Sequence, residues 1–191
     1  AITGAGNLTV DGADVNNLNT TAKTYTGSTN VKSGVLVVGV AIASTDVNVS
    51  GGALATTNGS LAAGTDLDIS GGSVDVMDND TIASATMSGG SIVGDSTLTV
   101  TGTYDQSGGT LASGVTVNAG GAKTLSGGTI AGTLGGAGAV EPHRVDRFSL
   151  RLAGQIGGRD LGADLGNCVV EFDQTALFFS KPGAFAAKGP R

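Results

Sequence analysis

The tripeptide Ser-Gly-Gly recurs five times along the chain at a nearly constant spacing. The five copies begin at Ser50, Ser70, Ser88, Ser107 and Ser126. The second residue after each glycine pair is always aliphatic: Leu54, Val74, Ile92, Leu111 and Ile130. The residue before each serine is apolar in four copies and is Gln106 in the remaining one. A fixed period of this kind is typical of repeat architectures, in which each repeat is one unit stacked on the next.

Within one repeat, the apolar residues predict a strand, a corner and a second strand. Leu67 and Ile69 alternate with polar residues and therefore point to one side of a strand. Val74 follows Ile69 at an odd spacing, so both side chains can face inward only if the chain bends between them. Glycine permits the positive φ that such a bend requires. We therefore expect an all-β fold, a right-handed parallel β-helix of about seven coils over residues 1–140, with an antiparallel sandwich or barrel as the alternative.

Asparagine is the residue that we expect in the turns of this fold, because it tolerates left-handed backbone and bonds locally to the main chain. The asparagines assigned to turns are Asn30, Asn48, Asn58, Asn79 and Asn118.

Composition excludes several classes of protein. The chain has 191 residues, of which 34 are glycine and 39% are hydrophobic, and this hydrophobic fraction argues against a wholly disordered chain. The net charge of −6, without a basic cluster anywhere in the region 1–140, argues against nucleic-acid binding. No apolar run is long enough to predict a membrane-spanning helix. Because the sequence begins at Ala1 without methionine, we expect either a removed signal peptide or an internal fragment.

The segment TYTGSTNVKSGVLVV, residues 24–38, resembles the strand repeat of autotransporter passenger domains. The positions that fit the family pattern are Thr24, Tyr25, Thr26, Gly27, Thr29, Val31, Gly34, Leu36 and Val38, whereas Lys23 stands where asparagine is usual. The glycine-rich segment at residues 132–140 is also similar to one that such passengers carry. The resemblance covers residues 1–140. It implies a secreted or surface-exposed β-helix of a Gram-negative bacterium, outer membrane-associated and exported by a barrel that lies outside this sequence.

What the resemblance implies about function is a structural or adhesin-like scaffold that binds a surface ligand, protein or glycan, of unknown identity. Two alternatives stay open, a carbohydrate-active β-helix enzyme and an ice-binding solenoid. For the latter, the relevant residues are Thr97, Thr99, Thr101 and Thr103, which we place on one strand face.

The composition changes at residue 141. The segment 141–191 contains all three prolines, all five phenylalanines, the only histidine and cysteine, and seven of the ten lysines and arginines. This segment is too short for even an eight-stranded export barrel. We expect residues 141–191 to be a non-repeat tail, which is a cap on the last coil, a mobile segment or foreign sequence. As a cap, the tail would bury Phe148, Leu150 and Leu152 against Ile130 and Leu134.

Carboxylates are the strongest candidates for chemistry. Aligned on Ser-Gly-Gly, Asp46 stacks on Asp66, and Asp68 lies on the same outward face. This patch is interpreted as solvated carboxylates, with a calcium site and an acid/base pair as alternatives. The segment MDNDTI carries Asp78 and Asp80, which we interpret as a polar turn because the rest of a calcium loop is missing.

His143 and Cys168 have no partners at catalytic spacing. We therefore assign no catalytic, cofactor-binding or metal-ligating residue and expect no enzyme activity.

Overall fold

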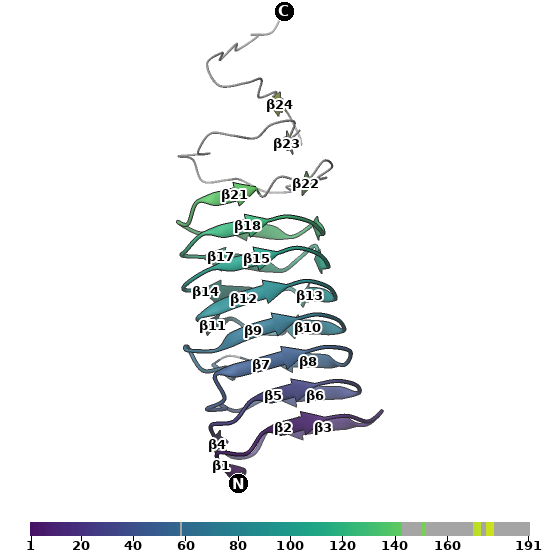
Figure 1. Cartoon of the computed structure of the whole chain (residues 1–191), viewed down its shortest axis with the longest axis vertical. Coiled ribbons are helices and arrows are strands. Elements are labelled where there is room, and N and C mark those ends of the chain that lie inside the picture. Colours follow the sequence, from purple (N-terminus) through teal and green to yellow (C-terminus); the bar gives the residue numbers. More distant parts are fainter. Residues whose placement is uncertain (58, 143–149, 152–169, 173–174, 178–191) are drawn as a thin grey trace, which may run out of the picture.

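The computed structural model describes residues 1–57, 59–142, 150–151, 170–172 and 175–177. Within these residues all regular secondary structure is β-strand, and residues 1–142 form a β-solenoid of about seven turns. In Figure 1 the strands nearest the viewer run to the right as the chain rises from the N-terminus, which makes the solenoid right-handed. The predicted right-handed parallel β-helix is therefore confirmed.

The solenoid has three faces, each made of parallel strands from successive coils (Figure 1). The first face is an eight-stranded sheet of β2 (Leu8–Val10), β5 (Thr29–Val31), β7 (Asp46–Val49), β9 (Asp66–Ile69), β12 (Ser84–Met87), β15 (Tyr104–Gln106), β18 (Lys123–Leu125) and β21 (Val140–Pro142). The second is a seven-stranded sheet of β3 (Val15–Leu18), β6 (Val35–Val38), β8 (Ala53–Thr56), β10 (Ser73–Val76), β13 (Ser91–Gly94), β16 (Thr110–Leu111) and β19 (Thr129–Ile130).

The third face is a regular sheet only in the C-terminal half of the solenoid. There it consists of β11 (Asp80–Ile82), β14 (Thr97–Val100), β17 (Thr116–Ala119) and β20 (Thr133–Gly135). In the N-terminal half the described strands are β1 (Thr3–Gly4) and β4 (Thr24–Tyr25), joined to the next coil by one bridge between Lys23 and Ile42. Because no sheet continues below it, β11 is an edge strand.

Strand pairing brings equivalent residues of successive coils into register. On the seven-stranded sheet the inward column is Leu36, Leu54, Val74, Ile92, Leu111 and Ile130, and every member is buried. The predicted inward residues Leu67 and Ile69 form the same kind of column with Val47 and Val49 on the eight-stranded sheet. Each coil buries only a few aliphatic side chains, at roughly 1.5–3 kcal/mol each, so stability comes from stacking.

The Ser-Gly-Gly motif turns the chain from the eight-stranded to the seven-stranded sheet. Gly109 is representative, since its φ is +69° and an added Cβ would lie 2.6 Å from the carbonyl oxygen of Gly89 in the preceding coil. Both the left-handed backbone and the close approach of successive coils therefore require glycine here. The predicted glycine corner is confirmed.

Two local predictions are wrong. Asn30, Asn48 and Asn118 lie in β5, β7 and β17 rather than in turns, because side chains on the outward face of a strand are free to be polar. Asn79 precedes β11 as predicted, and Asn58 lies outside the described residues.

The threonine prediction also needs correction. Thr97 and Thr99 lie on β14, but this strand ends at Val100, so Thr101 and Thr103 belong to the following corner.

Residues 141 and 142, which we assigned to the tail, continue the stack as part of β21. Beyond them, the tail contributes three short strands to the described residues. These are β22 (Leu150–Arg151), β23 (Val170–Phe172) and β24 (Thr175–Leu177), which form a separate three-stranded sheet. The alternatives of a cap, a mobile segment or foreign sequence for residues 141–191 concern side chains that lie largely outside the described residues, as do Phe148 and Leu152.

Candidate functional site

The outward face of the eight-stranded sheet carries an uninterrupted column of polar side chains, one from each strand. We call this column the polar ladder. Its members are Thr9, Asn30, Asn48, Asp68, Thr86, Asp105, Thr124 and Glu141. All eight are exposed or half-buried. Successive members are about 4.8 Å apart along the solenoid axis, because that is the spacing of hydrogen-bonded strands. The ladder is therefore a regular row of hydrogen-bonding groups facing solvent.

Side-chain hydrogen bonds hold the N-terminal part of this sheet in place. The Nδ2 atom of Asn48 donates to Oδ1 of Asn30 (3.3 Å) and to Oδ1 of Asp46 (2.8 Å). The Oγ atom of Ser84 donates to Oδ1 of Asp66 (2.5 Å) in the preceding coil. Such bonds, within a strand and between coils, fix the orientation of the outward groups.

The seven-stranded sheet differs on its outward face. One column begins with Val15, Val35 and Ala53 and only then changes to the hydroxyl side chains of Ser73 and Ser91. The exposed fraction of Val15 is 59%. An unbroken polar column thus distinguishes the eight-stranded sheet from its neighbour.

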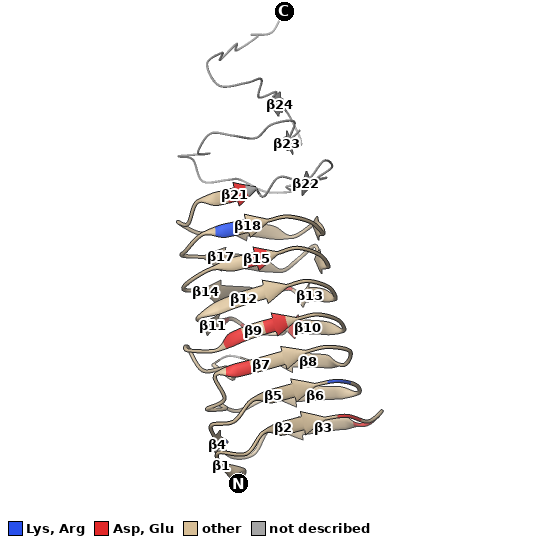
Figure 2. Ribbon diagram, viewed as in Figure 1, with Lys and Arg blue, Asp and Glu red and all other residues tan. Residues whose placement is uncertain are grey.

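The predicted acidic patch lies beside the polar ladder. Asp46 pairs in register with Asp66, and Asp68, further along β9, is a member of the ladder; the acidic positions of β7 and β9 are red in Figure 2. All three residues are exposed. The stacking and the outward direction of these carboxylates are therefore confirmed. Within the part of the chain that the structure describes, no three histidine, cysteine or acidic side chains are close enough together to hold a metal ion.

Asp80 occupies a quite different position, in the interior of the solenoid. It pairs in register with Leu98, which is followed by Val117 and Leu134, so Asp80 takes an inward position that is aliphatic in the later coils. Only 3% of the residue is exposed. The interpretation of Asp78 and Asp80 as one polar turn is thus wrong for Asp80, whereas Asp78 is exposed in the bend before β11.

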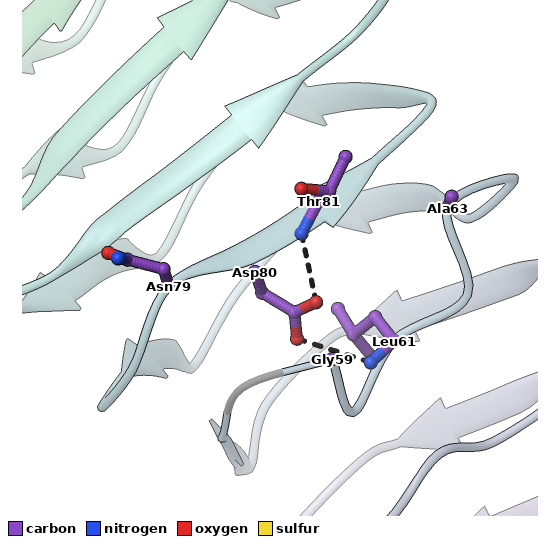
Figure 3. Close-up of a pocket in the computed structure, with 6 residues that line it drawn as sticks. All are labelled: Gly59, Leu61, Ala63, Asn79, Asp80 and Thr81. Carbon is purple, nitrogen blue, oxygen red and sulfur yellow. Dashed lines mark hydrogen bonds between the residues drawn. The ribbon is translucent and has the colours of Figure 1, made fainter.

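The Asp80 carboxylate joins β11 to the coil below it (Figure 3). Its Oδ2 accepts hydrogen bonds from Oγ of Ser60 (3.0 Å) and from the backbone N–H of Leu61 (3.1 Å). Its Oδ1 accepts from the backbone N–H of Thr81 (2.9 Å). Burial away from water raises the pKa of this carboxyl, and the hydrogen bonds oppose that effect only in part.

The reason for a buried carboxylate here is the free edge of β11. The edge of a sheet leaves backbone N–H groups without a neighbouring strand, and an inward-pointing charge is one way in which proteins block such an edge. Asp80 satisfies the N–H groups of Thr81 and Leu61 at the point where the regular third face begins. A shallow pocket of about 180 Å³ adjoins it, lined by Gly59, Leu61, Ala63, Asn79, Asp80 and Thr81.

Tyr104 and Gln106 are among the other polar residues buried in the core, and sequence reasoning missed both. The hydroxyl of Tyr104 donates to Oε1 of Gln106 (2.9 Å), and Nε2 of Gln106 donates to the carbonyl oxygen of Thr129 (3.2 Å). Burial raises the pKa of the Tyr104 hydroxyl. The small side chain of Ala85 pairs with Tyr104 and leaves room for the ring.

Lys123 lies in the same inward column, on the other side of Tyr104. It is only 2% exposed, and its Nζ donates to the carbonyl oxygens of Gly136 (3.3 Å) and Gly138 (2.5 Å). Burial lowers the pKa of this amine. The signal that could have found it is strand parity, because Lys123 is two positions before the buried Leu125.

Threonines line part of the third face. Thr97 pairs in register with Thr116, which pairs with Thr133, while Thr99 has Thr81 on one side and Asn118 on the other. One outward column of the third face is thus threonine in three successive coils, whereas the column beside it is mixed.

The described residues offer polar surfaces that can form hydrogen bonds with a ligand or with solvent. His143 and Cys168 lie outside them, so their predicted lack of partners stays a prediction. In the same described ranges there is no helix long and apolar enough to cross a membrane. Searches against protein-family models, curated proteins and solved structures find no match to this chain.

Proposed function

We propose that this chain is a structural and interaction protein, a secreted or surface-displayed β-helix scaffold of the passenger type, whose polar ladder binds a protein or glycan ligand. The observation that supports the proposal is the unbroken row of eight polar side chains on the eight-stranded sheet. Hydrogen-bonding groups that repeat at about 4.8 Å suit a ligand that lies extended along the solenoid. The resemblance of residues 24–38 to passenger repeats supports the exported location.

The ladder combines orientation with access to solvent, the two properties that a binding surface needs. Its backbone is held by parallel pairing on both sides of every internal strand. Part of the cost of ordering the side chains is already met in the free protein, since Asn30 and Asn48 are hydrogen-bonded to one another. The carboxylates of Asp68 and Asp105 leave the ladder acidic, which favours ligands with amine or hydroxyl donors.

The test is binding of the purified chain to an immobilised panel of glycans and extracellular-matrix proteins. Replacement of Asp68 and Asp105 together by alanine is expected to remove binding to whichever ligand the wild-type chain retains. The matched control replaces Ser73 and Thr110 by alanine on the outward face of the seven-stranded sheet and should leave binding intact. Equal binding by all three proteins would show that the ladder is not the site.

Two other readouts on the same protein address the other candidate functions. Turnover of acidic polysaccharides would support an enzyme in place of the scaffold, and thermal hysteresis would support an ice-binding solenoid in place of the scaffold. The genomic sequence on both sides of this segment tests the exported location, for which we expect an upstream signal peptide and a downstream barrel.

A further inference from the structure

Five asparagines stand in the triplet Asn-x-Ser/Thr with no proline between. They are Asn7, Asn19, Asn48, Asn58 and Asn79. The triplet is the acceptor motif for N-linked sugars, which are attached through the side-chain amide nitrogen. On a folded protein, transfer requires that this nitrogen be free and that the triplet can leave the surface to enter a transferase. Asn58 lies outside the described residues, but the structure separates the other four.

Asn48 is held inside β7. Its side chain is half-buried, and its Nδ2 atom donates to both Asn30 and Asp46. An amide nitrogen carries two N–H groups, so attachment of a sugar would break at least one of these bonds. The folded structure therefore protects Asn48.

Asn7 and Asn79 are exposed, but their triplets continue directly into strands. Oδ1 of Asn7 accepts a hydrogen bond from the backbone N–H of Ser28 (3.0 Å), and Oδ1 of Asn79 accepts one from Thr97 (2.9 Å). The third residues of these triplets lie in β2 and β11 and are fixed by strand pairing.

Asn19 is the described acceptor whose whole triplet lies outside the strands. It follows Leu18, the last residue of β3, and Asn19, Thr20 and Thr21 are all exposed in a bend. Within the described part of the chain, the Asn19 side chain makes no hydrogen bond. Gly39 of the next coil lies against it, and an added Cβ there would lie 3.3 Å from the Asn19 Cβ. Both the amide nitrogen and the threonine hydroxyl that a transferase recognises are therefore accessible.

We propose that Asn19 is an acceptor site for an N-linked sugar and is modified on the folded protein. The donor is a sugar activated as a diphosphate ester. A bond forms between Nδ2 of Asn19 and C1 of the sugar, and the C1–oxygen bond to the diphosphate breaks. The diphosphate leaves with the bonding electron pair, and the Nδ2 proton passes to a base of the transferase. The inference rests on the proposed exported location in one respect only, because that location determines whether the protein meets a transferase. The accessibility of Asn19 is a property of the folded chain itself.

The experiment incubates the purified 191-residue chain with a soluble transferase specific for Asn-x-Ser/Thr and a nucleotide-diphosphate hexose. Peptide mapping by mass spectrometry then gives the occupancy of each site. We expect a single hexose on Asn19 and at least about tenfold lower occupancy at Asn48, since transfer to Asn48 must break a hydrogen bond that the folded chain keeps.

Exposed variants sharpen the test without disturbing the core. Asn19→Gln and Thr21→Ala should abolish transfer at this site, Thr21→Ser should retain it, and Thr20→Ala is the matched control that should behave like wild type. A synthetic peptide of residues 15–25 verifies that the transferase accepts the local sequence. Failure of the folded chain to accept hexose while the peptide does, or equal occupancy at Asn19 and Asn48, would overturn the proposal. Neither outcome bears on ligand binding by the polar ladder, so the two proposals fail independently.

Discussion

In this fold, the effect of substituting a residue depends on whether its side chain points into the core or out to solvent. An inward side chain contacts equivalent side chains of the coils above and below, whereas an outward side chain on the same strand meets solvent. Ile92 and Asp68 exemplify the two cases, the first buried between Val74 and Leu111 and the second exposed on the polar ladder.

Substitution of these two residues should therefore have unequal effects. Ile92→Asp places an unpaired carboxylate between two aliphatic neighbours and should lower the free energy of unfolding by about 4 kcal/mol or more. Asp68→Asn should change it by no more than roughly 0.5 kcal/mol, as is typical of surface substitutions. Urea denaturation followed by circular dichroism measures both. Similar midpoints for the two variants would contradict the assignment of inward and outward faces.

Asp80 gives the protein a pH dependence of its own. Its carboxyl pKa is raised above the ordinary value of 3.8 in the folded chain, so the folded state holds this proton more tightly than the unfolded state does. The contribution of this group to stability should therefore increase as the pH falls through the window between the raised pKa and 3.8.

The measurement is the difference in melting temperature between wild type and Asp80→Asn across that window. The amide is permanently neutral and keeps an acceptor oxygen for Leu61 or Thr81. The melting temperature of wild type should therefore rise relative to that of the variant as the pH is lowered. A difference that does not vary with pH, or that changes in the opposite direction, would falsify the raised pKa.

Parity along a strand could be read from the sequence, and it correctly placed the aliphatic residues. The prediction failed where a polar residue occupies an inward position, because the polar chemistry of the side chain pointed the other way. Asp80 is two positions before the buried Ile82, and Gln106 is two after the buried Tyr104, so parity indicated the interior in both cases. Their chemistry indicated the surface. Asp80 and Gln106 can be buried because they have hydrogen-bond partners in other coils, Ser60 and Thr129, which no local sequence pattern reveals.

At the scale of elements, the glycine corner limits the distance between neighbouring coils. Two requirements coincide at Gly109, a positive φ and the close approach of Gly89. Gly59 has almost the same φ, +64°, but open space around the position of an added Cβ. An added Cβ would thus meet only backbone strain at Gly59, but both backbone strain and contact with the preceding coil at Gly109.

Alanine substitution at each glycine isolates these two effects. Gly59→Ala should cost only the left-handed backbone, about 1–2 kcal/mol. Gly109→Ala adds a collision with the backbone of the preceding coil and should cost about 1–3 kcal/mol more. Chemical denaturation of the two variants provides the comparison, in which equal losses would mean that the coils can separate at no energetic cost.

The three faces were not equally predictable. The first two are marked by Ser-Gly-Gly and its flanking aliphatic residues, so the corner and both adjoining strands could be inferred from the period. The third face has no repeated motif, and the coil in which β11 begins, from Ser70 to Ser88, is shorter than the coil before it. Its four-stranded sheet, and hence the edge that Asp80 closes, could not be derived from the pattern.

At the scale of the whole molecule, the repeat makes coils interchangeable as units. Met87 pairs in register with Gln106 of the next coil, so removal of residues 88–106 joins two equivalent points of the solenoid. The deletion takes Tyr104 together with its partner Gln106 and leaves Met87 to stack on Leu125.

We expect this whole-coil deletion to fold, with a β-sheet circular dichroism spectrum and a lower but still cooperative melting transition. Deletion of residues 97–106 alone should abolish folding, because it moves every later strand out of register with the coil below. If both deletions fold, or neither does, the coils are not independent stacking units.

Strand pairing in this solenoid also determines how the chain reaches its native state. Every pair of neighbouring strands in the solenoid joins residues about one coil apart in sequence. The loop that must close for each new contact therefore has nearly the same length at the first coil and at the last. The entropy of loop closure depends on that length, and it does not grow as coils are added. Folding can therefore nucleate at any pair of coils and propagate in both directions, at a rate set by local separation rather than by chain length.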